Sequence, residues 1–218
     1  MKQIISFDLD GTLVKSGFGD IVWLEGLPKV YAKENNISIE KSKLFFKEEY
    51  DNIGSDHREW YDLIFWINKY KLNITPKTLL DCYEHHIELY DDVKPVLNSL
   101  KKDFTLIISS GAMQEFIQKE SDYVGIKQYF EYAFSSTSDT KTVKKDPFFY
   151  KMIANRLNCR PENIIHVGDN LEYDYQSAIK AGLNAFYLNR FEASEESHIV
   201  SSLKEFEKKV RKIFKKVP

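Results

Sequence analysis

Five short hydrophobic runs recur along the chain and predict the strands of a buried sheet. They cover residues 4–7, 105–108, 132–134, 163–167 and 185–188. Continuous apolar runs of this length are typical of parallel strands that are covered on both faces. The last four runs are separated by stretches with a helical spacing of apolar residues, which predicts repeated strand–helix units. The pattern therefore predicts an α/β protein with a parallel sheet flanked by helices.

The interval between the first two runs has a different pattern. From about residue 16 to residue 90 it contains no convincing strand and several helical segments. Thr75 followed by Pro76 predicts an N-cap and the first residue of one such helix. A single crossover helix is enough to join two parallel strands, so an interval of this length predicts an inserted all-helical domain. We expect a core domain made of residues 1–15 and 91–218, and a helical insert at 16–90.

The segment Asp-Leu-Asp-Gly-Thr at residues 8–12 follows the first run directly. Side chains two positions apart on an extended chain project to the same side, so Asp8 and Asp10 can face one point, and Gly11 lets the backbone turn away. Two desolvated carboxylates repel each other, and a bound cation cancels most of that cost. An ordinary polar turn is the alternative. The arrangement predicts a metal site with an acidic nucleophile or base beyond the strand ends.

The second run ends in Ser109 and Ser110, followed by Gly111. In a parallel sheet this end lies on the same edge as Asp8. A hydroxyl group and the backbone N–H groups that open a helix from about Ala112 can bind an anion. The alternative is that either serine is a simple N-cap.

Two adjacent lysines, Lys144 and Lys145, precede Asp146 and Pro147, which predict an N-cap and the first residue of a helix. A lysine that enters an acidic site neutralises charge and binds a phosphate oxygen as a point charge. Ordinary surface charge is the alternative for either lysine.

The fourth run leads into Gly168, Asp169 and Asn170, and Asp174 stands five positions beyond Asp169. A strand end again delivers a carboxylate after a glycine. Oxygen ligands from a few carboxylates, completed by water, suit Mg²⁺, and residues 168–174 include none of the histidines and cysteines that suit zinc. The alternative is a helix cap at Asp169 and a solvated Asp174.

Composition narrows the function classes. The 218 residues include 31 basic and 33 acidic residues, a net charge of −2, so there is no global field for nucleic acid or an anionic membrane. No targeting sequence or membrane span is expected. Cys82 and Cys159 predict two reduced thiols in a cytoplasmic protein. The basic helix expected from Ile199 predicts a terminal helix that packs one stripe on the core, with membrane or nucleic-acid binding as the alternative.

Taken in order, these segments resemble the haloacid dehalogenase (HAD) superfamily of phosphotransferases. The similarity rests on residues 8–12, on Ser109, on Lys144 with Asp146 and Pro147, and on Gly168 and Asp169 through Asp174. It implies a Rossmann-like core and equates the insert with the helical cap of subfamily I. The third segment commonly reads Lys-Pro-Asp-Pro in the family. Here Lys145 replaces the first proline, and Lys144 holds the matching lysine position.

The resemblance implies a Mg²⁺-dependent phosphatase for a small phosphorylated metabolite. Asp8 is then the nucleophile that forms an aspartyl-phosphate, and Asp10 is the general acid and base. The implied catalytic residues are Asp8, Asp10, Ser109 and Lys144, and the implied substrate-binding residues are Ser109, Ser110 and Lys144. The implied metal ligands are Asp8, Asp10 through its backbone carbonyl, Asp169 and Asp174, the last directly or through water.

Other interpretations stay open at this point. A haloacid dehalogenase uses the same nucleophile but leaves Asp10, Asp169 and Asp174 without a task, and a phosphosugar mutase keeps the same acidic set. A non-catalytic phospho-acceptor is the candidate from another class. In the insert, His57 or Arg58 is a candidate for contact with a second anionic group of the substrate. The alternative is that both residues belong to a solvated helix start. The sequence fixes neither the substrate nor the oligomeric state.

Overall fold

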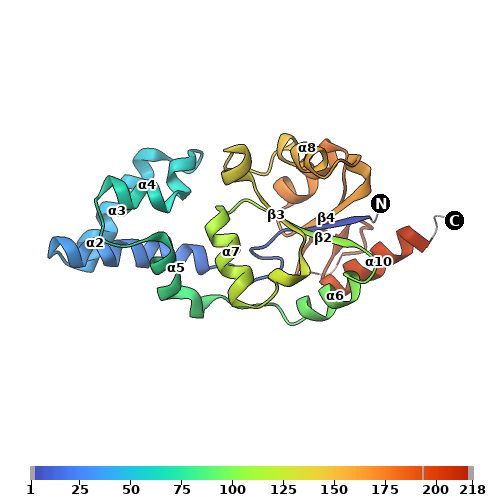
Figure 1. Ribbon diagram of the computed structural model, residues 1–218, viewed down its shortest axis with the longest axis horizontal. Helices are drawn as coiled ribbons and strands as arrows, with labels where there is room; N and C mark the ends of the chain where they lie inside the picture. Colours follow the sequence, from blue (N-terminus) through green and yellow to red (C-terminus); the bar gives the residue numbers. More distant parts are fainter. Residues whose placement is uncertain (1–2, 193, 216–218) are drawn as a thin grey trace.

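Six parallel strands in the order β3-β2-β1-β4-β5-β6 form the centre of the molecule (Figure 1). The computed structural model describes residues 3–192 and 194–215. The strands are β1 Ile4–Phe7, β2 Thr105–Ser110, β3 Tyr132–Ser135, β4 Ile164–Gly168, β5 Asn184–Leu188 and β6 Ile199–Val200. The predicted α/β class with a parallel sheet is confirmed, and all five hydrophobic runs form strands.

The sixth strand, β6, was not predicted. Residues 199–200 were expected to open the terminal helix, but they pair with β5 at Tyr187 and Leu188. The helix α10 begins at Leu203 and runs to Lys215. Of its predicted apolar stripe, Leu203, Phe206 and Val210 are buried in the core, whereas Ile213 is 41% exposed.

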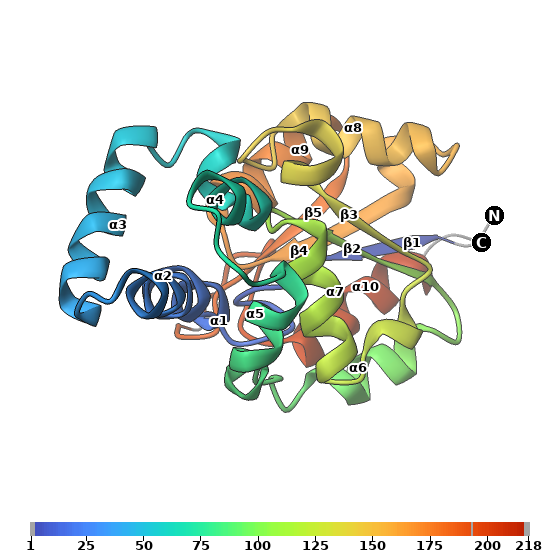
Figure 2. The ribbon, with the colours of Figure 1, turned by 60° about the vertical axis from the view of Figure 1, so that its left-hand side comes forward.

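Helices cover both faces of the sheet (Figure 2). One face packs against α6 Val93–Leu100, α7 Gln114–Tyr123 and α10, and the other against α8 Pro147–Arg156 and α9 Ser177–Ala181. Alternate strand residues point to opposite faces. Ile5 and Phe7 therefore belong to the first hydrophobic cluster and Ile4 to the second. Burial on both faces leaves the strand ends as the place where polar groups can gather.

The helical insert lies to one side of the sheet (Figures 1 and 2). Within residues 18–86, all of them described, there is no strand. The elements here are α1 Phe18–Ile21, η1 Val22–Gly26, α2 Leu27–Asn35, α3 Ile39–Ile53, η2 Arg58–Tyr61, α4 Leu63–Lys69, α5 Pro76–Tyr83 and η3 Glu84–His86. Thr75 caps α5 as predicted, since its hydroxyl accepts a hydrogen bond from the Thr78 N–H at 3.1 Å. The domain boundaries at 15/16 and 90/91 stay a prediction.

Short helical turns link the remaining elements: η4 Lys127–Tyr129, η5 Ser136–Thr140, η6 Pro161–Asn163 and η7 Leu171–Gln176. Among residues 3–192 and 194–215, no helix combines the length and the apolar character needed to cross a bilayer. Cys82 and Cys159 are free thiols, as the sequence predicts.

Candidate active site

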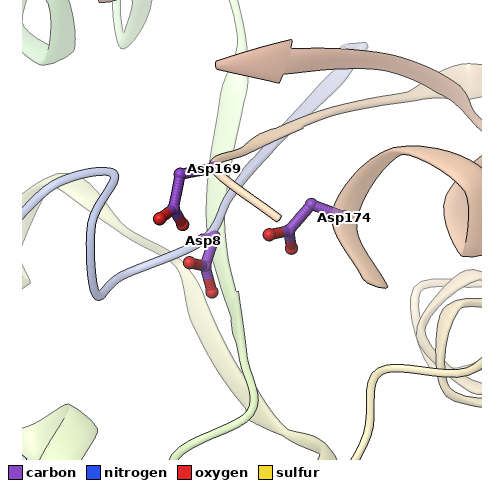
Figure 3. A group of neighbouring side chains, drawn as sticks. All are labelled: Asp8, Asp169 and Asp174. Atoms are coloured by element: carbon purple, nitrogen blue, oxygen red, sulfur yellow. The ribbon is translucent and has the colours of Figure 1, made fainter. Parts of the chain in front are cut away.

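Three carboxylates meet where β1 and β4 end. The two strands are neighbours in the sheet, with Phe7 beside Val167, and the Asp8 N–H donates to the Val167 carbonyl at 2.9 Å. Asp8 therefore leaves β1 beside the point where Asp169 leaves β4. Oxygen atoms of Asp8, Asp169 and Asp174 all lie within 4.8 Å of one another, and the three side chains are neighbours at the strand ends (Figure 3).

Two glycines permit this close approach. Gly11 has a φ of +74°, and a Cβ there would lie 2.2 Å from Asp169 Oδ2. At Gly168, a Cβ would lie 2.2 Å from Asp174 Cγ. A side chain at either position would push a carboxylate out of the cluster, so the site requires both glycines, and the positive φ of Gly11 also favours glycine in the turn.

Lys145 bridges two of the carboxylates. Its Nζ lies 2.5 Å from Asp8 Oδ1 and also contacts Asp174 Oδ1. The Lys145 side chain is only 7% exposed. The sequence predicts that Lys144 enters the site, but the structure places it outside. Its side chain is 51% exposed, and its Nζ lies 3.0 Å from Asp56 Oδ1.

A tight turn explains which lysine is buried. The Asp146 N–H donates to the Lys144 carbonyl at 2.9 Å, which places Lys145 at the centre of the turn. Asp146 then caps α8 as predicted, because its carboxylate accepts from the Phe149 N–H at 2.9 Å. Because Asp146 fixes the start of α8, Lys145 projects into the site and Lys144 projects to the surface.

A buried polar network stands behind the carboxylates. Nε2 of His166 hydrogen-bonds with Asp174 Oδ1 at 3.0 Å, and its Nδ1 hydrogen-bonds with Ser6 Oγ at 2.8 Å. Ser6 in turn donates to Ser109 Oγ at 2.7 Å. The second oxygen of Asp174 accepts from the Asn170 N–H at 3.0 Å. Both Asp174 oxygens are thus engaged by the protein, which fixes the orientation of this carboxylate.

The serines at the end of β2 are placed as follows. Ser109 is buried and hydrogen-bonded to Ser6, and Ser110 Oγ accepts from the Ala112 N–H at 3.0 Å. The following helix begins at Gln114 rather than at Ala112. Its first N–H donates to Ser138 Oγ at 3.0 Å. A loop of three residues therefore separates the strand end from the helix, and neither serine is the N-cap.

Burial and crowding shift the acid strengths in the cluster. Burial raises the pKa of Asp8 well above its ordinary value, an effect that Lys145 opposes and Asp174 reinforces. Burial also raises the pKa of Asp10, to about 6. Burial acts to raise the pKa of Asp174, but the charge of Lys145 and the hydrogen bond from His166 outweigh it and lower that pKa. Asp174 is thus the stable anion of the cluster.

Asp10 faces a cavity of about 450 Å³ between the helical insert and the core. Trp23, Trp60 and Tyr61 of the insert and Glu120 of α7 also line it. Asp10 stands two residues beyond Asp8 and therefore connects the carboxylate cluster to this cavity. A substrate with its reacting group at Asp8 has room here for the rest of the molecule.

His57 and Arg58 were open candidates for substrate contact. Arg58 Nε donates to the Thr137 carbonyl at 3.1 Å, and its guanidinium lies 3.5 Å from Asp62. His57 is exposed. Neither residue is among those that line the cavity in the described part of the chain.

Three polar residues of the region were missed by sequence reasoning: Ser6, His166 and Glu120. A histidine inside the apolar run of β4 and a serine inside that of β1 are the signals that were available. Glu120 follows Phe116 by four positions on α7, which puts its carboxyl group on the buried face of that helix. Each signal is a polar residue at a position where the pattern demands an apolar one.

The donor set at the strand ends fits a divalent cation. Asp8, Asp169 and Asp174 offer only oxygen atoms, which suits Mg²⁺. Thr12 Oγ1 lies 3.5 Å from Asp169 Oδ1. Reduced hydration and the charge of Asp174 raise the pKa of Asp169 as well. Three carboxyl groups therefore face a single ammonium group, that of Lys145.

The sequence of the chain is similar to those of known hydrolases. A family model described as haloacid dehalogenase-like hydrolase matches residues 2–182. The chain is 25% identical over 202 residues to human N-acylneuraminate-9-phosphatase, which covers 84% of this chain and 80% of that protein.

Solved structures give the same result for the fold. A HAD phosphatase from Thermococcus onnurineus superposes with a TM-score of 0.74 at 25% identity, covering 98% of each chain. A 2-haloacid dehalogenase from Pseudomonas syringae pv. Tomato superposes with a TM-score of 0.66 at 18% identity, covering 98% of this chain and 100% of the other.

Proposed function

Because the chain belongs to the haloacid dehalogenase-like hydrolases, we propose that it is a Mg²⁺-dependent phosphatase that hydrolyses a small phosphorylated metabolite. The observation that carries the proposal is the pairing of Asp8 with Lys145 at the end of β1, with Asp10 two residues beyond. The same family includes proteins with phosphatase names and with dehalogenase names. The choice between these activities therefore rests on the site.

Asp8 acts as the nucleophile in this proposal. One carboxylate oxygen attacks phosphorus, the bond from phosphorus to the leaving oxygen breaks, and an aspartyl-phosphate forms. Lys145 holds the other oxygen of Asp8 and leaves a positive charge beside the transferring phosphoryl group. Ser109 and Ser110, at the end of the neighbouring strand β2, are proposed to hold phosphoryl oxygens.

Asp10 is the proposed general acid and base. It protonates the leaving oxygen in the first step. In the second step it removes a proton from the water that attacks phosphorus, and the bond between phosphorus and the Asp8 oxygen breaks to release phosphate. A carboxyl group with a pKa of about 6 is suited to both tasks, because it exchanges its proton near neutral pH. A dehalogenase has no alkoxide to protonate, so this residue favours phosphoester chemistry.

Asp8 and Asp169 are the proposed ligands of Mg²⁺, together with the backbone carbonyl of Asp10. Both oxygens of Asp174 are already hydrogen-bonded within the protein, so we assign it to a water-mediated role. The cation, when bound, neutralises the charge that develops on the phosphoryl oxygens. The residues 16–90 are proposed to act as a cap that excludes bulk water from the cavity.

The test is the turnover of p-nitrophenyl phosphate with Mg²⁺ and with excess EDTA. We expect steady release of p-nitrophenol with Mg²⁺ only, and none from Asp8→Asn. Asp103→Asn is the matched control, because Asp103 is exposed and precedes β2 at the opposite edge of the sheet. Equal turnover in EDTA, or wild-type turnover by Asp8→Asn, would contradict the proposal.

Two further readouts separate the alternatives. Halide release from 2-chloropropionate without metal supports a dehalogenase. A single phosphorylation of the protein without turnover supports a phospho-acceptor. Either result, in place of steady p-nitrophenol release, overturns the proposed phosphatase activity.

A further inference from the structure

The cavity beside Asp10 has an unusual balance of charge. It is lined by three carboxyl side chains, those of Asp10, Asp20 and Glu120. Of the described residues that line it, none is lysine, arginine or histidine. The remaining wall consists of small or apolar residues: Ser16, Gly17, Gly19, Trp23, Trp60, Tyr61, Gly111, Ala112, Met113, Phe116 and Val143.

Glu120 adds a buried carboxyl group to the cavity wall. The residue is 1% exposed, and its side chain lies within hydrogen-bonding reach of Asp10. Two neighbouring carboxyl groups favour a hydrogen-bond donor or a cation beside them.

Aromatic residues line the same cavity. Trp23 stacks on Phe116 with a centroid distance of 5.7 Å, and its ring centroid lies 5.8 Å from that of Trp60. Tyr61 packs against Trp60 at 4.6 Å. Rings combined with carboxylates are the groups that bind an organic cation, through cation–π attraction and through charge pairing.

The cationic residues next to the lining residues in sequence are engaged elsewhere. Lys119, beside Glu120, pairs with Glu84 at 2.7 Å and also with Asp81. Lys144, beside Val143, pairs with Asp56, and Arg58 lies against Asp62. An anionic leaving group in this cavity would face carboxylates without a compensating positive charge.

We propose that the leaving group of the substrate carries an ammonium group, so that the substrate is the phosphomonoester of an amino alcohol. The proposal rests on the proposed phosphatase function and adds the chemical class of the alcohol. A neutral polyol can hydrogen-bond with Glu120, but only a cation also pairs with the charge of Asp20 in the same wall. The aromatic rings then cover the apolar surface around the nitrogen.

The test compares each amine substrate with its uncharged isostere. Phosphocholine is paired with the analogue that has carbon in place of the quaternary nitrogen, and phosphoethanolamine with propyl phosphate. For at least one pair we expect kcat/KM to favour the ammonium compound by roughly tenfold or more, the size of a partly desolvated cation–π and charge contact. Equal values in both pairs, or a preference for the isosteres, would overturn the proposal.

Two variants locate the preference in the cavity. Glu120→Gln should reduce the ratio of ammonium to isostere kcat/KM severalfold, while Glu115→Gln, the same change on the same helix outside the cavity, should preserve it. Asp20→Asn supplies an independent variant, because Asp20 is exposed and its replacement does not disturb the core. A ratio unchanged in both Glu120→Gln and Asp20→Asn would refute the assignment of the cavity.

The hydrolysis of p-nitrophenyl phosphate keeps the two proposals separable. If Mg²⁺-dependent turnover of this compound is present and the ammonium preference is missing, the substrate class is wrong and the phosphatase function stands. If p-nitrophenyl phosphate and every alkyl phosphate are left intact, the phosphatase function itself is wrong.

Discussion

Replacing Lys145 by glutamine removes the one ammonium group that bridges Asp8 and Asp174. The side chains of the three residues are 7%, 7% and 0% exposed, so water cannot replace the lost charge. Breaking a buried ion pair by removing one partner costs about 3–5 kcal/mol. The adjacent Lys144→Gln is the matched control. Its ion pair with Asp56 is exposed, and such pairs contribute at most about 1 kcal/mol.

The assay is urea unfolding at neutral pH in EDTA. With a denaturant slope of about 2 kcal/mol/M, a loss of about 3–5 kcal/mol lowers the midpoint by roughly 2 M. Lys144→Gln should move it by about 0.5 M or less. The loss in Lys145→Gln should shrink as the pH falls, because Asp8 has a raised pKa and takes up a proton instead of remaining an uncompensated anion.

Activity gives the second readout of the same pair. Lys145→Gln should reduce kcat for p-nitrophenyl phosphate by about 10²–10³, the range found when one donor to a developing charge is removed. Lys144→Gln should stay within about twofold of the wild type. Equal midpoints for the two variants, or a greater loss of activity in Lys144→Gln, would refute the assignment of Lys145 to the site.

Further predictions concern the residues around the cluster. Gly168→Ala should destabilise the protein by about 1–3 kcal/mol and lower kcat, because the new Cβ would clash with Asp174; unchanged melting temperature and kcat would contradict this. His166→Leu should cost about 2–3 kcal/mol in urea unfolding, since it leaves Ser6 and Asp174 short of a buried partner; a neutral effect would argue against the network. Burial raises the pKa of Glu120 well above 4.5, so wild-type stability should fall as the pH rises above that value, by up to about 1.4 kcal/mol per pH unit. Glu120→Gln should flatten that fall, and parallel pH profiles of the two proteins would disprove the assignment.

The strands and the placement of Asp8 and Asp169 could be predicted because they depend on local pattern and on topology. A run of apolar residues specifies a buried strand, and parallel strands deliver their carboxyl ends to one edge of the sheet. Asp8 and Asp169 follow such runs directly. Their meeting therefore needs no knowledge of side-chain packing.

The choice of Lys145 over Lys144 could not be predicted in the same way. Both lysines precede the same helix, and the motif position alone favours the first. The structure decides through the hydrogen bond from Asp146 to the Lys144 carbonyl, which sets the direction of each side chain. A turn of this size depends on backbone angles that the sequence pattern does not specify.

Glu120 and β6 depend on tertiary contacts. Glu120 becomes a cavity residue only when α7 lies beside Asp10, and sequence spacing carries no information about that distance. The strand β6 has only two residues, too few to show the alternation of apolar and polar residues that marks a strand. It is defined by its pairing with β5. In both cases the partner lies outside the local segment that the pattern describes.

The central claim is that Asp8 and Asp169, brought together by β1 and β4, hold one divalent cation. Calorimetric titration with Mg²⁺ tests it most directly, with Asp169→Asn as the variant and Asp103→Asn as the control. We predict one Mg²⁺ per chain for the wild type and the control, and binding at least about tenfold weaker for Asp169→Asn, equivalent to about 1.4 kcal/mol. No binding by the wild type, or equal affinity in Asp169→Asn, would contradict the claim.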